Sequence, residues 1–203
     1  MTLILVRHGQ TDANAAGLLQ GRADLSLNDR GRSQAAECAD ALRQVVESGA
    51  RVVSSPLARA RETAAIIAGA ERRVLIDDAW IELDYGTLDR TPTAEVPTSL
   101  WAQWRADLAY VPGGGESLLD LGERVRAACA ALIDEAGRGD VIVVSHVSPI
   151  KAAVAWALDV GDGTSWRMQL DQAAITRIGC SPRGGALRSF NETWHLDRPR
   201  PSA

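Results

Sequence analysis

Short apolar runs alternate with segments of helical periodicity along the 203 residues of this chain. The apolar runs predict four buried strands, at 2–6, 51–54, 74–76 and 141–145. The segments between and after them predict helices at 28–47, 56–68, 117–136 and 149–158. Strands that alternate with helices are typical of an α/β fold, in which helices cover both faces of a mostly parallel central sheet.

Capping residues and turn residues mark the limits of these elements. Polar residues and prolines predict the helix starts, at Asn28, Ser55-Pro56, Ser117 and Ser148-Pro149. Near the end of the chain, two further runs at 174–178 and 187–190 flank a Gly-rich turn at 181–185. This pattern predicts a closing β-hairpin.

One long insertion, from about 87 to 115, interrupts the alternation. It contains apolar residues at helical spacing, Leu100, Trp101, Trp104 and Leu108. We expect this face to pack against the body of the protein. The alternative is that a tryptophan stacks on an aromatic or apolar leaving group. In either case the insertion should arch over one edge of the sheet, where loops on a rigid scaffold carry specificity.

Composition narrows the class of protein. A hydrophobic content of 46% supports one sizeable core, so residues 1–203 are expected to form a single domain. The formal net charge of −4 argues against nucleic acid or an anionic membrane as a partner. Three isolated cysteines, no signal peptide and no apolar run of transmembrane length predict a cytoplasmic protein. A homodimer is a reasonable default for a soluble enzyme.

The most informative chemistry lies where two of the strands end. The first strand stops at Arg7-His8-Gly9, and the strand at 141–145 is followed directly by His146. Only three histidines occur in the chain, and two of them lie at these positions. Since ligands bind at the carboxyl edge of open α/β sheets, we expect His8 and His146 to meet at a binding site there.

The residues at the first strand end suit phosphoryl transfer without a metal. A neutral imidazole at His8 can attack phosphorus and split the reaction into two easier steps through a covalent intermediate. The positive charge of Arg7 lowers the proton affinity of that imidazole, and its guanidinium can hold two phosphate oxygens. Gly9 lets a substrate approach the backbone closely.

An arginine and a carboxylate complete the predicted set. Arg59 lies in the first turns of a predicted helix, near its positive end, and its spacing from the strand favours it over Arg61. Glu82 lies in an aromatic-flanked turn and suits a side chain that gives a proton to the leaving oxygen and then takes one from water. From the residues alone, Asp84 and Asp89 remain alternatives for that role.

Each of these features alone has a plain structural explanation. An Arg-His-Gly run is a weak motif, His146 is equally well a satisfied core residue, and Arg59 is equally well a solvated helix charge. Their order along the chain and their positions at strand ends make the set specific.

The same residues resemble the histidine phosphatase superfamily, in its phosphoglycerate-mutase-like branch. The likeness runs from residue 3 to about 157. It includes Leu-Val-Arg-His-Gly-Gln-Thr at 5–11, Gly-Arg-Ala-Asp-Leu-Ser-Leu at 21–27, Ser-Ser-Pro-Leu-Ala-Arg-Ala at 54–60, Glu-Leu-Asp-Tyr-Gly at 82–86, Gly-Glu-Ser at 115–117, Arg124, and Val-Val-Ser-His at 143–146. The match at 82–86 selects Glu82 over Asp84 as the catalytic acid.

This resemblance implies a three-layer α/β/α sandwich with His8 as phosphoryl acceptor and Glu82 as proton donor. It implies that Arg7, Arg59 and His146 hold the phosphate, and that the substrate pocket is lined by Thr11, Asn14 and backbone groups around Gln20, Gly21 and Val147. No metal and no cofactor are expected. The expected partner is a small phosphorylated metabolite.

Two positions depart from the family pattern. Arg90 stands where the family commonly has glycine, and we expect its side chain to point to solvent rather than to a second anionic group. Val147-Ser148-Pro149 replaces two glycines that often follow the second histidine. The stretch at 146–151 looks closest to alpha-ribazole-phosphatase-like phosphatases.

The leading functional hypothesis is a phosphatase that hydrolyses a small phosphomonoester. The alternative is a phosphoglycerate-type phosphomutase, which in this family carries a longer, basic insertion after the acid turn. Here Arg90 and Arg105 are the only cations of the insertion, which favours hydrolysis. A non-catalytic phospho-ligand binding module is a third hypothesis, and the presence of both histidines and Glu82 argues against it.

Overall fold

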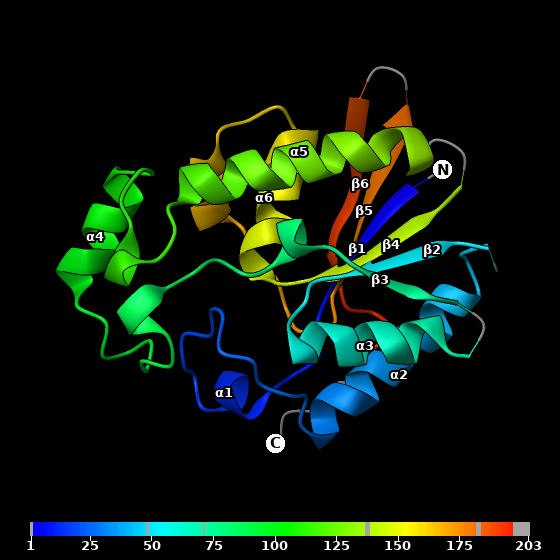
Figure 1. The fold of residues 1–203 in the computed structure, drawn as a ribbon, viewed down its shortest axis with the longest axis horizontal. Coiled ribbons are helices and arrows are strands. Elements are labelled where there is room, and N and C mark those ends of the chain that lie inside the picture. Colours follow the sequence, from blue (N-terminus) through cyan, green and yellow to red (C-terminus); the bar gives the residue numbers. More distant parts are fainter. Residues whose placement is uncertain (1, 48, 71, 137–138, 182–183, 197–203) are drawn as a thin grey trace.

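The strands form a six-stranded sheet in the computed structural model, which describes residues 2–47, 49–70, 72–136, 139–181 and 184–196 (Figure 1). Their order across the sheet is β3-β2-β4-β1-β5-β6. The strands are β1 (Thr2–Arg7), β2 (Arg51–Ser54), β3 (Val74–Ile76), β4 (Val141–Ser145), β5 (Ile175–Ser181) and β6 (Gly184–Glu192). The strands from β3 to β1 are mutually parallel, and β5 and β6 join as antiparallel neighbours. The predicted α/β fold with a mostly parallel sheet is confirmed.

Helices cover both faces of this sheet, as Figure 1 shows. They are α1 (Asp12–Ala15), α2 (Asp29–Arg43), α3 (Ala58–Ala68), α4 (Thr98–Ala106), α5 (Leu118–Ala136) and α6 (Val147–Ala157). The helices α5 and α6 lie on one face, and α2 and α3 lie on the other. Four short 3-10 turns stand at 78–80, 86–88, 112–114 and 162–167.

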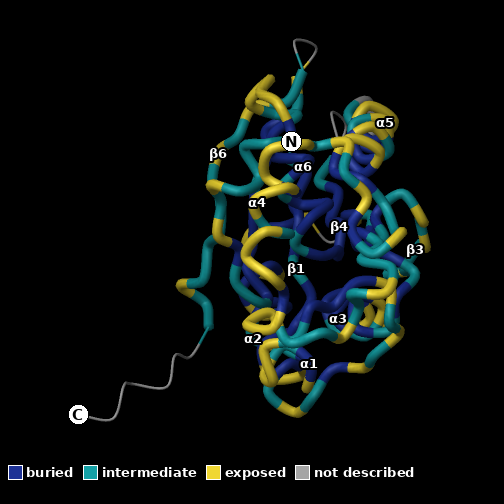
Figure 2. Tube along the Cα trace, turned by 90° about the vertical axis from the view of Figure 1, so that its left-hand side faces the viewer, coloured by how far each residue is buried: buried dark blue, intermediate teal, exposed yellow. Residues whose placement is uncertain are grey.

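The alternation of side chains along the strands divides the core into two parts. Leu3 and Leu5 of β1 pack with residues of α5 and α6, whereas Ile4 and Val6 pack with residues of α2 and α3. Both sets are fully buried, as expected for a parallel strand covered on two sides (Figure 2). The result is a rigid sheet whose carboxyl edge presents β1, β2 and β4 together.

The strands agree closely with prediction, and the hairpin is longer than predicted. The structure extends it to β5 and β6, with antiparallel pairing up to Ser181 and Gly184. The centre of the predicted turn, at 182–183, lies outside the described residues.

Three helix limits differ from prediction. The helix predicted to reach residue 47 ends at Arg43, because the N–H groups of the next three residues converge on the Leu42 carbonyl. The helix predicted to begin at 56 begins at Ala58, with Leu57 rather than Ser55 at the N-cap. The helix predicted to begin at 149 begins at Val147, because a carboxylate from another segment caps it, as described below.

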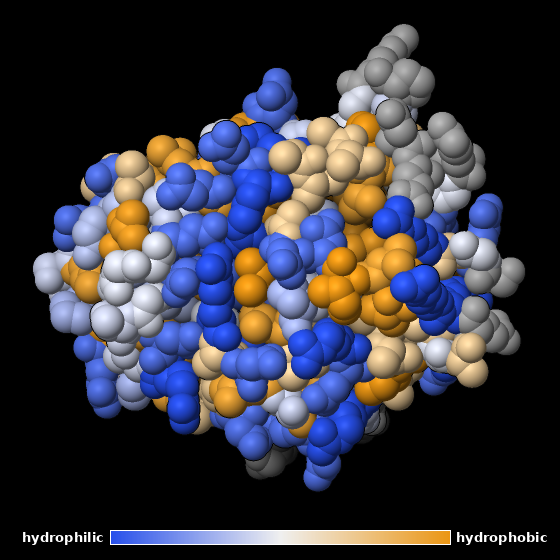
Figure 3. Space-filling model, in the orientation of Figure 1, coloured by the Kyte–Doolittle hydropathy of each residue, from blue (hydrophilic) through white to orange (hydrophobic). Residues whose placement is uncertain are grey.

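The insertion is a separate layer beyond the carboxyl edge of the sheet, built around α4 (Figure 1). Trp104 is buried in the core part that includes α5, and Leu100, Trp101 and Leu108 pack against it. The expected packing of this face is therefore confirmed. In the view of Figure 3, polar side chains cover most of the half around α4, while apolar side chains gather around the edge strand β3, where Ile76 is exposed.

Within the described part of the chain, no helix combines the length and apolar character needed to cross a membrane.

Candidate active site

Strand register brings the two predicted histidines together. Arg7 pairs with Ser145 across β1 and β4, and the His8 N–H donates to the Ser145 carbonyl at 3.0 Å. The next residues, His8 and His146, therefore leave the sheet side by side. Their ring centroids are 5.0 Å apart, the ring planes are inclined to each other by 58°, and both side chains are buried.

The hydrogen bonds of His8 define its tautomer. Nδ1 lies 2.7 Å from the Gly9 carbonyl, which can only accept, so Nδ1 carries the proton. Burial lowers the pKa of His8 well below its ordinary value, and the charges of Arg59 and Arg7 lower it further. At neutral pH the ring is therefore neutral, with the lone pair on Nε2.

Arg59 lies directly against that lone pair. It is the second residue of α3, and its Nε donates to His8 Nε2 at 3.3 Å. Its other nitrogens donate to the carbonyls of Ala23 at 2.8 Å and Gly21 at 2.7 Å. Burial lowers the pKa of Arg59 to about 10, so the guanidinium stays charged at neutral pH. Arg61 instead donates to the Pro56 carbonyl and is half exposed.

His146 lies beside His8 and contacts the segment before α3. Its Nε2 lies 2.7 Å from the Ser55 hydroxyl, which also accepts the Leu57 N–H at 3.4 Å just before α3. Its Nδ1 is buried and has no hydrogen-bond partner among the described residues. Burial, followed by the charge of Arg59, lowers the pKa of His146 well below its ordinary value. The neutral ring therefore keeps one unused nitrogen beside His8.

Arg7 borders the site from the end of β1. One of its terminal nitrogens donates to the Leu170 carbonyl at 2.6 Å, and its Nε is buried without a hydrogen-bond partner in the described structure. The other terminal nitrogen remains for a ligand. Burial lowers the pKa of Arg7 from its ordinary value, and the charge of Glu82 opposes that effect.

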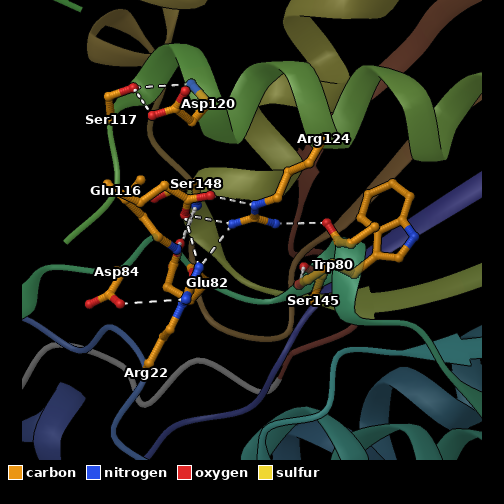
Figure 4. A network of polar contacts seen from close by, with 12 residues as sticks. Arg22, Trp80, Glu82, Asp84, Glu116, Ser117, Asp120, Arg124, Ser145 and Ser148 are labelled. Carbon is orange, nitrogen blue, oxygen red and sulfur yellow. Dashed lines mark hydrogen bonds and ion pairs between the residues drawn. The ribbon is translucent and has the colours of Figure 1, made fainter. Parts of the chain in front are cut away.

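Glu82 joins the site from the turn after β3. Its side-chain oxygens accept the N–H groups of Val147 at 3.1 Å and Ser148 at 3.2 Å, and that of Leu83 at 2.7 Å (Figure 4). Glu82 therefore acts as a helix cap for α6 from a distant part of the chain. This contact explains why α6 begins at Val147, and it corrects the expectation that Ser148 caps this helix.

A set of ionic contacts holds the backbone of the Glu82 turn (Figure 4). Arg124 of α5 donates to both carboxylate oxygens of Glu116, at 2.7 and 2.9 Å, and to the Ala79 carbonyl at 2.7 Å. Arg22 contacts Glu116 at 3.3 Å and Asp84 at 3.4 Å. The sequence motifs that contain Glu116 and Arg124 did not predict that these residues hold the Glu82 turn. Nothing in the sequence predicted this role for Arg22.

The alternative carboxylates have structural partners instead. Asp89 accepts the N–H groups of Gly21 at 2.9 Å and Ala23 at 2.8 Å, and so shapes the loop that Arg59 contacts. Asp84 accepts the Gly86 N–H at 2.8 Å. Of the three, Glu82 is the one that lines the cavity beside His8.

A cavity of about 150 Å³ opens in front of His8. Its walls include Arg7 and His8 at the end of β1 and, from the other predicted site residues, Asn14, Gln20, Glu82 and Val147. Arg59 and His146 lie beside His8 but are not part of the wall. The side-chain nitrogen of Gln20 is buried without a hydrogen-bond partner among described residues, which marks it as a donor for a ligand.

Two of the predicted pocket residues act indirectly. Thr11 does not line the cavity, and its hydroxyl donates to the Gln20 side-chain oxygen at 2.9 Å, as does Asn14. Gly21 also lies outside the cavity wall, because its N–H is bound by Asp89 and its carbonyl by Arg59. Neither residue is part of the cavity wall in this structure, and their role in binding substrate stays a prediction.

Arg90 is exposed and does not line this cavity or a second cavity that adjoins it. Its φ of 69° lies in the left-handed region, which favours glycine. Backbone geometry thus accounts for the glycine that the family commonly has there. No group of three or more His, Cys, Asp or Glu side chains is placed to hold a metal ion in the described residues.

Comparison with known proteins shows the family to which the chain belongs. Residues 3–193 match the model of the histidine phosphatase superfamily, branch 1. The chain belongs to this superfamily. It is 37% identical over 200 residues to the bifunctional protein Rv2228c of Mycobacterium tuberculosis, covering 96% of this chain and 54% of that protein. It thus spans about half the length of the mycobacterial relatives that it matches. It is also 30% identical to the probable phosphoglycerate mutase GpmB of Yersinia enterocolitica, covering 98% of this chain and 96% of that one.

Solved structures share the same fold. A phosphoserine phosphatase variant from Entamoeba histolytica, in complex with phosphoserine, superposes with a TM-score of 0.87 at 27% identity, covering 96% of this chain and 98% of that one. The alpha-ribazole phosphatase of Shigella flexneri superposes with a TM-score of 0.82 at 26% identity, covering 95% and 96%. The resemblance to the phosphoglycerate-mutase-like branch, alpha-ribazole phosphatases included, is confirmed.

Proposed function

We propose that this protein is a phosphatase that hydrolyses a small phosphomonoester through a phosphohistidine intermediate on His8. The observation that carries the proposal is the state of His8. Its Nδ1 proton is fixed by the Gly9 carbonyl, and its Nε2 lone pair faces Arg59 beside a cavity that Arg7 and Glu82 line. A neutral nucleophile among guanidinium groups is what attack on a phosphate dianion requires.

In the first step, His8 Nε2 forms a bond to phosphorus as the bond from phosphorus to the alcohol oxygen breaks. Glu82 gives its proton to that oxygen, so the alcohol leaves neutral. The imidazole becomes cationic, and the Gly9 carbonyl stabilises its Nδ1 proton. Arg59 moves from Nε2 to the phosphoryl oxygens, which Arg7 also binds.

In the second step, Glu82 takes a proton from water as the water oxygen attacks phosphorus. The bond between phosphorus and Nε2 breaks, inorganic phosphate leaves, and His8 returns to its neutral form. Glu82 is again protonated, so the cycle closes without a metal ion.

The positions of the two cations in the insertion favour hydrolysis over isomerisation. A mutase must hold a phosphorylated product while the phosphoryl group returns to a second oxygen. Neither cation of the insertion lines the cavity at His8, because Arg90 is exposed and Arg105 lies over the ring of Trp166 at 5.4 Å. With 3-phosphoglycerate we therefore expect release of inorganic phosphate rather than formation of the 2-isomer, and efficient isomerisation would reverse this ranking.

The direct test is turnover of phenyl phosphate by His8→Ala in excess EDTA. We expect activity to disappear, whereas the wild type is unaffected by EDTA. His195→Ala is the matched control, because this histidine lies outside the site and contacts the Ala173 carbonyl at 3.0 Å. Full activity in His8→Ala, or loss of wild-type activity in EDTA, would overturn the proposal.

A further inference from the structure

A second cavity, of about 140 Å³, adjoins the one in front of His8. The two share Tyr85 and Val147, so a group bound in one continues into the other. Its position places it beside Glu82, where the alcohol half of a phosphomonoester would leave. Cavities of about 150 Å³ hold a molecule the size of benzene, so a single ring fits.

Aromatic side chains form the walls of this second cavity. Trp101 and Trp104 of α4 lie parallel, with ring centroids 5.5 Å apart, and Trp166 meets both edge-on at 6.1 and 5.3 Å. Tyr85 meets Trp104 edge-on at 5.7 Å. Each ring is fixed by its neighbours, so the cavity is preformed, and flat apolar groups bind such walls well.

Among the described residues that line this cavity, Lys151 is the one cation. Lys151 is the only lysine in the chain, where the other basic residues are arginine. It lies one helical turn after Val147 on α6, and the spacing puts both on the face that borders the cavity. It is half-buried, and its ammonium makes no hydrogen bond or ion pair within the described residues.

The charges around Lys151 come from the active site. Burial lowers the pKa of Lys151, with the charge of Glu82 acting against that effect and the charge of Arg7 acting with it. An ammonium group with three donors, held beside tryptophan rings and lacking a partner, is stabilised when an anion binds next to it.

We propose that the alcohol half of the substrate is a ring-sized apolar group that carries an anionic substituent, such as a carboxylate, which pairs with Lys151. This inference rests on the proposed phosphatase function and adds a substrate class to it. The phosphate occupies the cavity at His8, the ring lies against Trp101 and Trp166, and the anion reaches Lys151.

The test compares esters that differ only in the leaving alcohol. Ethyl, benzyl, and 3- and 4-carboxybenzyl phosphates share the same kind of reacting bond, so differences in kcat/KM report binding of the alcohol. We expect benzyl to exceed ethyl phosphate by about tenfold through burial of the ring. We expect the better carboxybenzyl ester to exceed benzyl by about fivefold through a partly buried ion pair.

Variants of Lys151 test the ion pair. Lys151→Met keeps the length of the side chain, and it should erase the advantage of the carboxybenzyl esters over benzyl phosphate, while Lys151→Arg should keep most of it. Arg167→Met, which removes an exposed cation outside both cavities, should leave that advantage unchanged. Trp101→Leu should reduce the advantage of benzyl over ethyl phosphate.

The outcomes separate this inference from the proposed function. Equal kcat/KM for all esters would overturn the inference. An equal loss of kcat/KM in Lys151→Met for every ester would also overturn it, and would indicate that Lys151 binds the phosphate instead. Absence of turnover for every ester would count against the phosphatase. Binding of the matching phosphonates, whose ester oxygen is replaced by CH₂, tests the inference even then, and the same order of affinities is expected.

Discussion

The carboxylate of Glu82 accepts the backbone N–H of Ser148 at 3.2 Å, across 66 positions of sequence. This contact, with that to Val147, ties the turn after β3 to the start of α6. Since α6 begins directly after His146, the proposed acid and the second histidine are held at a fixed separation by the fold itself.

This contact predicts two separable effects of Glu82→Gln. The amide retains one acceptor oxygen and places an NH₂ group against backbone donors, so the free energy of unfolding should fall by about 1 kcal/mol, as for other lost caps. Without a proton donor, turnover of ethyl phosphate should fall far more than turnover of phenyl phosphate, whose leaving group needs less help. Urea denaturation and kcat for the two esters measure these effects. Equal losses for both esters would argue against Glu82 as the acid.

The loop after His8 depends on a close approach of backbone that only glycine permits. A Cβ at Gly31 would overlap the carbonyl oxygen of Gln10, and one at Gly9 would overlap the Gly31 carbonyl. Gly31→Ala should therefore lower the free energy of unfolding by about 1–3 kcal/mol and reduce kcat by shifting His8.

Gly49→Ala is the control for that change, because a Cβ there meets no atom within 4 Å. We expect it to change stability by less than about 0.5 kcal/mol and to leave kcat as in the wild type. Similar stability for both variants would show that the approach of Gly31 to Gln10 is not as close as described.

The buried histidines predict a pH-dependent stability. The pKa values of His8 and His146 lie well below 6.5 in the folded protein, mainly through burial, and return toward 6.5 on unfolding. Below pH 6.5 the unfolded chain therefore binds protons that the folded protein does not, and the free energy of unfolding falls as pH falls. Each histidine contributes a slope of up to about 1.4 kcal/mol per pH unit, and His195 acts in the same direction.

Urea denaturation between pH 7.5 and 5.5 measures this slope. His146→Gln should show a flatter dependence than the wild type, whatever its absolute stability. Constant or rising stability as the pH falls through this range would contradict the neutral, buried state of the two rings.

The ionic contacts around Glu116 predict unequal costs for two arginine substitutions. Arg124→Met leaves the largely buried Glu116 carboxylate with Arg22 alone and removes the donor to the Ala79 carbonyl, so it should cost about 1–3 kcal/mol. Arg43→Met removes an exposed pair with Asp40 and should cost less than about 1 kcal/mol. Thermal or urea unfolding of the two variants decides this. Equal costs would mean that the contacts of Arg124 do not hold the turn.

The strands and the main site residues were predictable because they depend on local pattern. An apolar run followed by a histidine defines both a strand and its end, and parallel strands bring their ends to one edge. On this basis the sequence predicted that His8 and His146 meet. The spacing from the preceding strand likewise favoured Arg59 over Arg61.

What escaped prediction depends on contacts between distant segments. The start of α6 is set by Glu82, so the local signal of Ser148 and Pro149 misplaced it by two residues. The role of Arg22 requires Glu116 and Asp84 to fold against it. A single lysine on a helix has no sequence signal of burial, and only the tryptophans of α4 and the 162–167 turn give Lys151 its surroundings.

The proposed mechanism requires that His8 accepts the phosphoryl group. Its most direct test is rapid mixing of the protein with ³²P-labelled phenyl phosphate, quenching in alkali, in which phosphohistidine survives, and mapping of the label by peptide analysis. We expect label on His8 during turnover, on Nε2 of the ring, and none in His8→Ala. Steady turnover with no label on the protein, or with label on His146 instead, would contradict it.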